Sequence, residues 1–224
     1  HRENQGKLEI TPNVKVTNKQ QLSLAYSPGV AEPCKEIHED SRKVYEYTIK
    51  GNTVAVVTDG TAVLGLGNIG AEASIPVMEG KAALFKSFAG INGVPIALDT
   101  TDTQEIIKTV KLIAPNYGGI NLEDISAPRC FEIEETLKKE TNIPIFHDDQ
   151  HGTAIVTMAG LINALKIVDK ELTNIKVVLN GSGAAGIAIV KLLHAYGVNN
   201  MIMCDSKGAI YSGRNFGMND TKTY

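Results

Sequence analysis

Short apolar runs alternate along this chain with longer segments in which apolar residues recur at helical spacing. The short runs predict buried strands at residues 53–58, 94–98, 119–122, 143–146, 176–179 and 201–204. The longer segments predict helices at residues 102–114, 130–140, 153–168 and about 184–196. Strands that alternate with helices are typical of a parallel sheet with crossover connections, so the pattern predicts the α/β class.

The same pattern predicts a boundary between two domains near residue 150. The helix expected at 153–168 leads into a second strand–helix–strand unit, whereas residues 1–20 are polar and irregular. We therefore expect an N-terminal α/β domain with a parallel sheet over residues 1–150. Residues 151–224 are expected to form the first half of a dinucleotide-binding domain of the Rossmann type.

Acidic residues follow the first four predicted strands at the point where each strand ends. They are Asp59, Asp99, Glu123, Asp124, Asp148 and Asp149. A single acid there is common, because aspartate is a frequent loop and cap residue. Two adjacent pairs are harder to dismiss, because ligands of open α/β sheets bind beyond the carboxyl ends of the strands.

Composition and charge narrow the classes of function. The chain is 43% hydrophobic and 21% charged, as in an ordinary globular protein. A net charge of -3 gives no electrostatic footprint for nucleic acid or for an acidic membrane surface. The sequence has no apolar run of membrane-spanning length and no signal-peptide pattern. We therefore expect a cytoplasmic protein that binds neither nucleic acid nor membrane.

The cysteines do not form a recognisable pattern. Cys34, Cys130 and Cys204 are odd in number and widely spaced, which favours neither a disulfide framework nor a zinc cluster. We expect reduced thiols in or near the core.

A glycine-rich loop follows the strand expected at 176–179 and precedes a helix. It holds Gly181, Ser182, Gly183, Ala184, Ala185 and Gly186. This spacing, with Asp205 at the end of the next strand, is typical of dinucleotide binding. Gly181 would make the tight turn, Gly183 would let the backbone approach the pyrophosphate, and Gly186 would let the helix pack closely. The helix N-terminus would face the phosphates. Asp205 would bond the ribose hydroxyls and favour NAD over NADP, an inference that nearby Lys207 weakens.

The acidic pairs offer only oxygen ligands, which suit Mg²⁺ or Mn²⁺. Adjacent carboxylates repel each other, and burying them is costly unless a cation holds them. Neighbouring residues of a strand point to opposite faces, so Glu123 and Asp124 reach one ion only if the strand has ended by then. Otherwise one member of each pair orients a base or caps a helix.

A zinc-protease reading competes for the same stretch. His147 and His151 are spaced as in the HExxH motif, with Asp148 at the glutamate's place. That motif needs a helix to bring both histidines to one face. Pro144 and the apolar run instead favour a strand through Phe146, and Gly152 favours a loop, so we favour the oxygen-ligand site.

Taken together, these stretches resemble the malic enzymes of the small bacterial type. The matching segments are "LSLAYSPGVAEPC", "VVTDGTAVLGLGNIG", "PVMEGKAALFKSFAGI", "INLEDISAPRCFEIE", "IFHDDQHGTAIV" and "NGSGAAG", in the family's order. The resemblance implies oxidative decarboxylation of L-malate to pyruvate and CO₂ with reduction of NAD or NADP, dependent on Mn²⁺ or Mg²⁺. It also implies a homodimer.

The resemblance also assigns roles to residues. Glu123, Asp124 and Asp149 match the metal ligands. Lys81 matches the general base, and Asp148 the aspartate that tunes that lysine. Tyr26 matches the general acid that protonates the enolate. Taken singly, Tyr26 would be read as a core tyrosine and Lys81 as a solvated helix lysine.

Two departures from the family's pattern limit the reading. The larger eukaryotic enzymes have an arginine within "TDGER" that clamps a substrate carboxylate, and here Ala62 stands at its place, as in the small bacterial enzymes. The chain also starts at His1 without a methionine and ends at Tyr224, early in the cofactor domain. We expect either a fragment or a naturally truncated protein with an unpaired sheet edge.

Two other functions therefore stay open. A chain without the rest of the cofactor domain is an inactive module that binds metal or carboxylates. An intact protein with the same site is alternatively a malolactic enzyme, which keeps NAD bound and releases lactate and CO₂.

Overall fold

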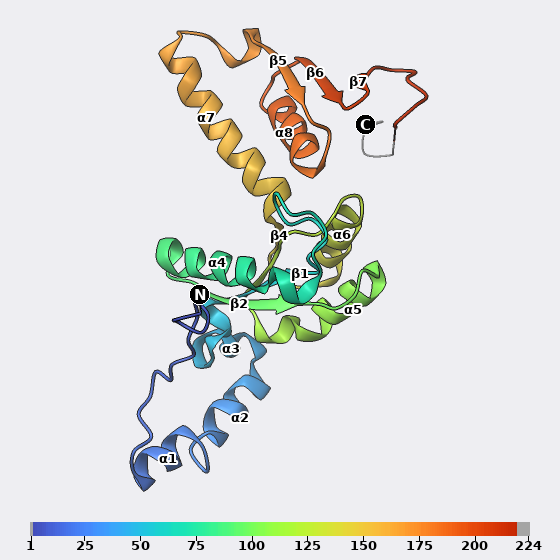
Figure 1. The fold of residues 1–224 in the computed structure, drawn as a ribbon. Helices are drawn as coiled ribbons and strands as arrows, with labels where there is room; N and C mark the ends of the chain where they lie inside the picture. Colours follow the sequence, from blue (N-terminus) through green and yellow to red (C-terminus); the bar gives the residue numbers. More distant parts are fainter. Residues whose placement is uncertain (1, 219–224) are drawn as a thin grey trace.

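The structure is a computed structural model, and it describes residues 2–218 (Figure 1). Its larger sheet has four parallel strands in the order β2-β1-β3-β4. These are β1 (Thr53–Thr58), β2 (Asn92–Ala97), β3 (Gly119–Leu122) and β4 (Ile145–His147). The central strands β1 and β3 are almost wholly buried, as expected where helices cover both faces of a parallel sheet.

Helices cover the two faces of this sheet, and Figure 1 shows α4 (Ala71–Ala89) and α5 (Thr103–Ile113) on opposite sides of it. On one face, α5 and α6 (Arg129–Glu140) pack against Ala55 and Val57 of β1 in a continuous apolar cluster. The intervening Val56 is equally buried but lies outside that cluster, because strand side chains alternate between faces. The α4 face is packed so closely that a Cβ on Gly93 would meet Ala82 at 2.6 Å.

The second unit begins with α7 (Thr153–Ile167) and contains β5 (Lys176–Asn180), α8 (Ala184–Ala195), β6 (Asn200–Asp205) and β7 (Gly208–Ala209). Strands β5 and β6 are parallel, and β7 pairs antiparallel with β6. A small cluster around Met158, Leu193 and Val198 joins α7 to α8. Among the described residues, β5 has a strand partner on one side only.

The N-terminal segment extends away from both units (Figure 1). Lys7 binds α4 through the carboxylate of Glu79 (3.1 Å) and the carbonyl of Pro76 (2.8 Å). The chain then runs outward to α1 (Lys19–Ala25) and α2 (Ala31–Glu39), neither of which buries a residue. The short α3 (Val44–Tyr47) leads back to β1. We call residues 8–39 the N-terminal arm.

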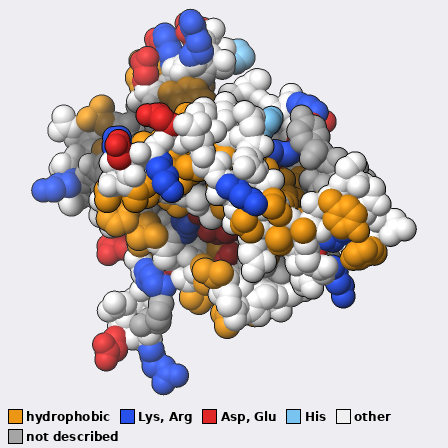
Figure 2. Space-filling model, turned by 90° about the horizontal axis from the view of Figure 1, so that it is seen from above, with side chains coloured by type: hydrophobic (Ala, Val, Ile, Leu, Met, Phe, Trp, Pro, Cys, Tyr) orange, Lys and Arg blue, Asp and Glu red, His pale blue; other side chains and the backbone are white. Residues whose placement is uncertain are grey.

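Many large hydrophobic side chains are exposed, and Figure 2 shows such side chains spread over the face seen from above. In the N-terminal arm they are Leu8, Ile10, Val14, Val16, Leu22, Leu24, Tyr26 and Val30. A surface with so many apolar groups in one segment indicates a contact region. Among the described residues, no helix is both long enough and apolar enough to cross a membrane.

The sequence prediction of an α/β protein with a parallel sheet is confirmed, and the strands at 53–58 and 119–122 match residue for residue. The strand expected at 143–146 is shifted toward its carboxyl end, to Ile145–His147. The hydrophobic pattern did not predict α1 to α3 or β7, and it gave no bounds for α4, although Lys81 was expected on a helix. The loop expected at Gly152 is wrong, because residues 148–152 form one π-helical turn that continues directly into α7.

Candidate metal and catalytic site

Three carboxylates converge beyond the carboxyl ends of β3 and β4. One ligand oxygen each from Glu123, Asp124 and Asp149 lies within 4.8 Å of the others. Both neighbouring acids, Glu123 and Asp124, lie beyond the strand, because β3 ends at Leu122 and Asp124 adopts a left-handed conformation with φ of 54°. Aspartate tolerates that conformation better than most residues. The turn brings both neighbouring acids to one point.

The adjacent pair after β4 is divided between two partners. Asp148 accepts a hydrogen bond from the Lys81 Nζ at 2.7 Å, while an oxygen of Asp149 accepts from the backbone N–H of Asp124 at 2.9 Å. The π-helical turn makes this division possible. A Cβ at Gly152 would meet Asp148 Oδ1 at 2.6 Å, so a larger residue there would displace the Asp148 carboxylate.

Lys81 comes from α4 and reaches carboxylates that follow both β3 and β4. Its Nζ lies 2.7 Å from Asp148 Oδ2 and 3.2 Å from Glu123 Oε1. Burial lowers the pKa of Lys81, but the hydrogen bond to Asp148 and the charge of Glu123 outweigh burial and hold the pKa above its usual value. The lysine is therefore a cation that offsets part of the acidic charge.

That offset is incomplete. Burial raises the pKa of Glu123 to about 7, against the lowering effect of Lys81. Burial, and then the charge of Asp149, raise the pKa of Asp124 to about 6. Asp124 Oδ2 is buried and has no hydrogen-bond partner. A buried, unpartnered oxygen in a group of three converging carboxylates fits a hard divalent cation such as Mg²⁺ or Mn²⁺.

The remaining acids after strands lie outside this cluster. Asp59 is buried and pairs with Arg129, whose Nη2 is 2.8 Å from Asp59 Oδ2. Arg129 also donates to the Thr61 hydroxyl at 2.9 Å, in the stretch where the larger enzymes carry their arginine. Asp99 is exposed. Acids at neighbouring strand ends thus take different roles, which the spacing alone does not distinguish.

The histidines do not form a zinc site in the described part of the chain. His151 Nε2 is bonded to Glu134 at 2.9 Å, and the nearest acid to His147 Nε2 is Asp149 Oδ2, at 3.5 Å. Burial lowers the pKa of His147. Within residues 2–218, the group with metal-ligand geometry is the three carboxylates.

Tyr26, in contrast, does not lie with the cluster. It directly follows α1, which Figure 1 shows at the far end of the molecule from β4, and it is 70% exposed. The reading of Tyr26 as a core tyrosine is therefore wrong for this chain. Its predicted role as general acid stays a prediction.

The glycine loop has the geometry that dinucleotide binding requires. Gly181 has φ of 132°, which favours glycine, and a Cβ at Gly186 would meet the Gly181 carbonyl oxygen at 2.0 Å. A Cβ at Gly183 would meet nothing within 4 Å, so the backbone faces open space at the start of α8. The loop thus turns tightly, packs its helix closely and leaves room for a pyrophosphate.

Asp205 carries a partner that the sequence did not indicate. The buried guanidinium of Arg214 bonds both of its carboxylate oxygens, with Nη1 3.1 Å from Oδ1, and the backbone N–H of Lys207 donates to Oδ1 at 2.9 Å. Because this pair neutralises the aspartate, repulsion of a 2′-phosphate weakens. The argument from Asp205 for NAD over NADP therefore loses most of its force.

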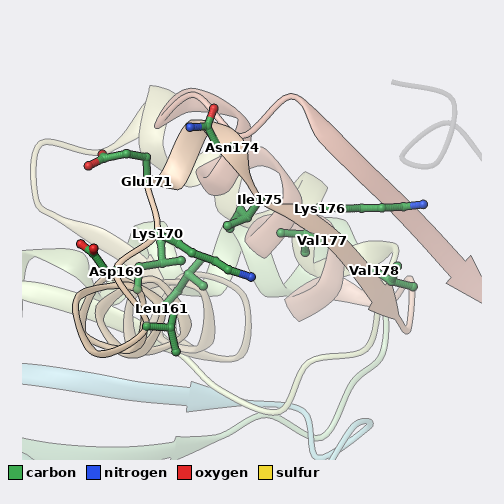
Figure 3. A pocket seen from close by; sticks show the side chains of 11 residues that line it. Leu161, Asp169, Lys170, Glu171, Asn174, Ile175, Lys176, Val177 and Val178 are labelled. Atoms are coloured by element: carbon green, nitrogen blue, oxygen red, sulfur yellow. The ribbon is translucent and has the colours of Figure 1, made fainter.

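A cavity of about 780 Å³ lies away from these groups. Figure 3 shows it between the end of α7, the following turn and β5, lined by side chains such as Leu161, Asp169, Lys170 and Val177. None of the three clustered carboxylates lines this cavity. The candidate catalytic site therefore does not coincide with this cavity.

The three cysteines differ in burial. Cys130 is buried, and burial raises its pKa to about 11, which makes the thiol unreactive. Cys204 is partly buried, but Cys34 is exposed, against expectation.

Comparison with known families matches both parts of the chain. The model described as malic enzyme, N-terminal domain matches residues 5–138, and the model described as malic enzyme, NAD binding domain matches residues 150–219. The chain belongs to the malic enzyme family.

Individual relatives agree with this membership. The chain is 72% identical, over 99% of its length, to the bifunctional malic/malolactic enzyme of Bacillus subtilis, and 65% identical, over 92%, to the NAD-dependent malic enzyme of Geobacillus stearothermophilus. It superposes on the crystal structure of the NAD-dependent malic enzyme of Thermotoga maritima with a TM-score of 0.95, at 49% identity over 99% of this chain and 59% of that one. It spans 54% and 43% of the first two relatives, about half their length.

Replacing Asp124 tests whether the cluster is built for a cation. In the metal-free chain at neutral pH, Asp124→Asn should raise the free energy of unfolding by on the order of 1 kcal/mol, because it removes a buried like charge. Asparagine also accepts the left-handed backbone. The same variant should bind Mn²⁺ at least about 10-fold more weakly.

Thermal unfolding with and without Mn²⁺ measures both effects. Asp99→Asn, at an exposed acid after β2, is the matched control and should change neither. A variant at Asp124 that unfolds at lower temperature without metal, yet keeps full stabilisation by Mn²⁺, would contradict the assignment.

Proposed function

We propose that this chain forms the substrate and metal half of an enzyme that oxidises L-malate and decarboxylates it to pyruvate and CO₂, with reduction of NAD or NADP. The observation that carries the proposal is the convergence of Glu123, Asp124 and Asp149, with Lys81 at hydrogen-bond distance from the neighbouring Asp148. One buried oxygen of Asp124 in this group has no hydrogen-bond partner. Hard carboxylates, a lysine and a dinucleotide loop together suit metal-assisted oxidation of a hydroxy acid.

The roles proposed for the residues follow from their charges. Glu123, Asp124 and Asp149 hold a divalent cation, Mn²⁺ or Mg²⁺, and when bound it polarises the C2 oxygen and stabilises an enolate. Lys81 accepts the proton of the C2 hydroxyl. Asp148 orients its Nζ. Asp148 and Glu123 together hold the pKa of Lys81 above its usual value, so a neutral lysine requires their charge to be offset.

We propose that residues 1–150 act as the substrate and metal domain and residues 151–224 as part of the cofactor domain. The loop from Gly181 to Gly186 would receive the pyrophosphate at the N-terminus of α8. The pair of Asp205 and Arg214 would lie near the adenosine ribose. The pair argues for neither NAD nor NADP, because the carboxylate is neutralised.

We further propose a homodimer in which the N-terminal arm packs on the second copy. The arm supports this because α1 and α2 bury no residue of their own and expose a series of large apolar side chains. Tyr26 sits at the end of α1, far from the cluster of its own chain. A general acid at Tyr26 would therefore serve the site of the partner.

The malolactic reaction is the second candidate. Its support is the 72% identity to a relative named as a bifunctional malic/malolactic enzyme. Both reactions use malate and the same metal site, and they differ in the product released, pyruvate or lactate. A chain that binds metal without turnover is the outcome expected if the residues beyond this segment are needed to hold the nicotinamide.

Replacing Lys81 separates chemistry from metal binding. In the whole protein, Lys81→Ala should lower malate oxidation by at least about 100-fold, because a general base typically contributes that much. Mn²⁺ binding should persist, because the lysine is not a ligand. Lys86→Ala, which removes an exposed lysine from the same helix, is the control and should leave turnover intact. Turnover that survives without Lys81 would remove it from the reaction.

Mixed dimers test whether Tyr26 acts across the interface. Tyr26→Phe and Lys81→Ala should each be inactive alone, but dimers with one chain of each kind should regain activity, because one of their sites holds an intact tyrosine and an intact lysine. Differently tagged chains, purified as heterodimers, allow the measurement. Heterodimers as inactive as the parents would show that both residues must come from one chain.

A further inference from the structure

A buried carboxylate occupies a core position of α6 without belonging to the acidic cluster. Glu134 lies on the same stripe of α6 as Cys130, Ile133 and Leu137, all of which are buried. It is 4% exposed. A charged group at such a position is costly to desolvate unless several donors surround it, so its presence calls for a function.

Two of the donors at Glu134 come from the π-helical turn and from the residue that precedes it. The backbone N–H of His147, the last residue of β4, donates to Oε1 at 3.2 Å. The His151 Nε2 lies 2.9 Å from Oε2 and 2.8 Å from Oε1. The ring of His151 also contacts Phe146, with 5.7 Å between centroids. Lys138, one turn along α6, supplies a further contact at 2.8 Å. One carboxylate thus ties α6 to both ends of the turn.

The turn held in this way is the segment that divides the aspartate pair. Asp148 and Asp149 lie between the two residues that Glu134 binds, and they face Lys81 and the carboxylate cluster respectively. If the turn rotated by one residue, Asp148 and Asp149 would either exchange their partners or lose contact with both Lys81 and the cluster. Ligand geometry at a metal must hold to a fraction of an ångström, so a support behind the ligands matters.

We propose that Glu134 is a positioning residue for the metal site, and that His151 is the side chain through which it fixes the π-helical turn. Glu134 itself belongs neither to the carboxylate cluster nor to the groups proposed to act on the substrate. It acts by holding His147 and His151, so that Asp149 reaches the metal while Asp148 reaches Lys81. This inference rests on the proposed metal site and adds the support behind it.

The alternative is that Glu134 only stabilises the packing of α6 on β4. The two readings predict different amide exchange in the metal-free protein and different Mn²⁺ affinity. A packing role predicts a uniform loss of stability with no change in the Mn²⁺ affinity of the folded molecules. A positioning role predicts faster amide exchange confined to residues 147–152, together with weaker Mn²⁺ binding.

Glu134→Gln is the main variant, because it keeps the shape and one acceptor while it removes the charge. It should weaken Mn²⁺ binding about 10-fold to 100-fold, the loss typical of a residue that orients a metal ligand. Glu135→Gln is the matched control on the same helix. Glu135 makes an exposed pair with Lys139 at 2.7 Å, so its replacement should change neither affinity nor exchange. Mn²⁺ affinity is measured by calorimetric titration of the 224-residue chain, and amide exchange is measured without metal.

Variants of His151 keep the test decisive if Glu134→Gln does not fold. His151 is partly exposed, so its replacement is better tolerated. His151→Ala should reproduce the loss of Mn²⁺ affinity, and His151→Gln, which retains a donor, should restore part of it. Mn²⁺ affinity equal to that of the wild type in every folded variant would overturn the proposal. Failure of the wild type to bind Mn²⁺ would instead overturn the proposed function.

Discussion

Repulsion among three converging carboxylates, two of them buried, is the constraint on which the rest of this structure depends. Glu123, Asp124 and Asp149 are held within 4.8 Å at the carboxyl edge of a parallel sheet, where burial raises the pKa of two of them to about 7 and about 6. Lys81 offsets only part of their charge. We propose that a fold which keeps such a group together without enough protein cations is arranged for a positive ligand, and oxygen donors suit Mg²⁺ or Mn²⁺.

The fold achieves this arrangement with two local departures from regular structure. The left-handed residue Asp124 ends β3 abruptly, so that neighbouring acids which would otherwise face opposite sides reach one point. The π-helical turn after β4 then sends Asp148 to Lys81 and Asp149 to the cluster. Both departures cost conformational energy, and irregular backbone of this kind is typical of functional sites.

Much of the fold and part of the site follow from the sequence. The strand at 53–58 was predictable because residues 54–57 form a continuous apolar run, typical of a strand buried on both faces. The strand at 119–122 was predicted from a shorter apolar stretch that Asn121 interrupts. The acidic pairs were visible as carboxylates at strand ends. The positions of their side chains were not, because they depend on a left-handed residue and a π-helical turn, for which periodicity gives no signal.

The contacts of Asp205 and of Glu134 were not predicted, because their partners lie in other segments of the chain. Arg214 binds Asp205 from beyond β7, and only its position as a lone arginine after the strand offered a hint. Glu134 reads as one more acid on a charged helix, although its place on the apolar stripe of α6 was a detectable signal. The exposed position of Tyr26 follows from the N-terminal arm, whose helices α1 and α2 bury no residue against this chain's own core.

The measurement that tests the account most directly is the formation of reduced nicotinamide from L-malate, Mn²⁺ and either NAD⁺ or NADP⁺. It is made with the 224-residue chain beside the whole protein, and pyruvate and lactate are assayed in the same samples. The account predicts that reduced cofactor and pyruvate rise together in the whole protein and that chelation of the metal abolishes both. Absence of reduced cofactor, pyruvate and lactate, in a whole protein that binds Mn²⁺ normally, would contradict it.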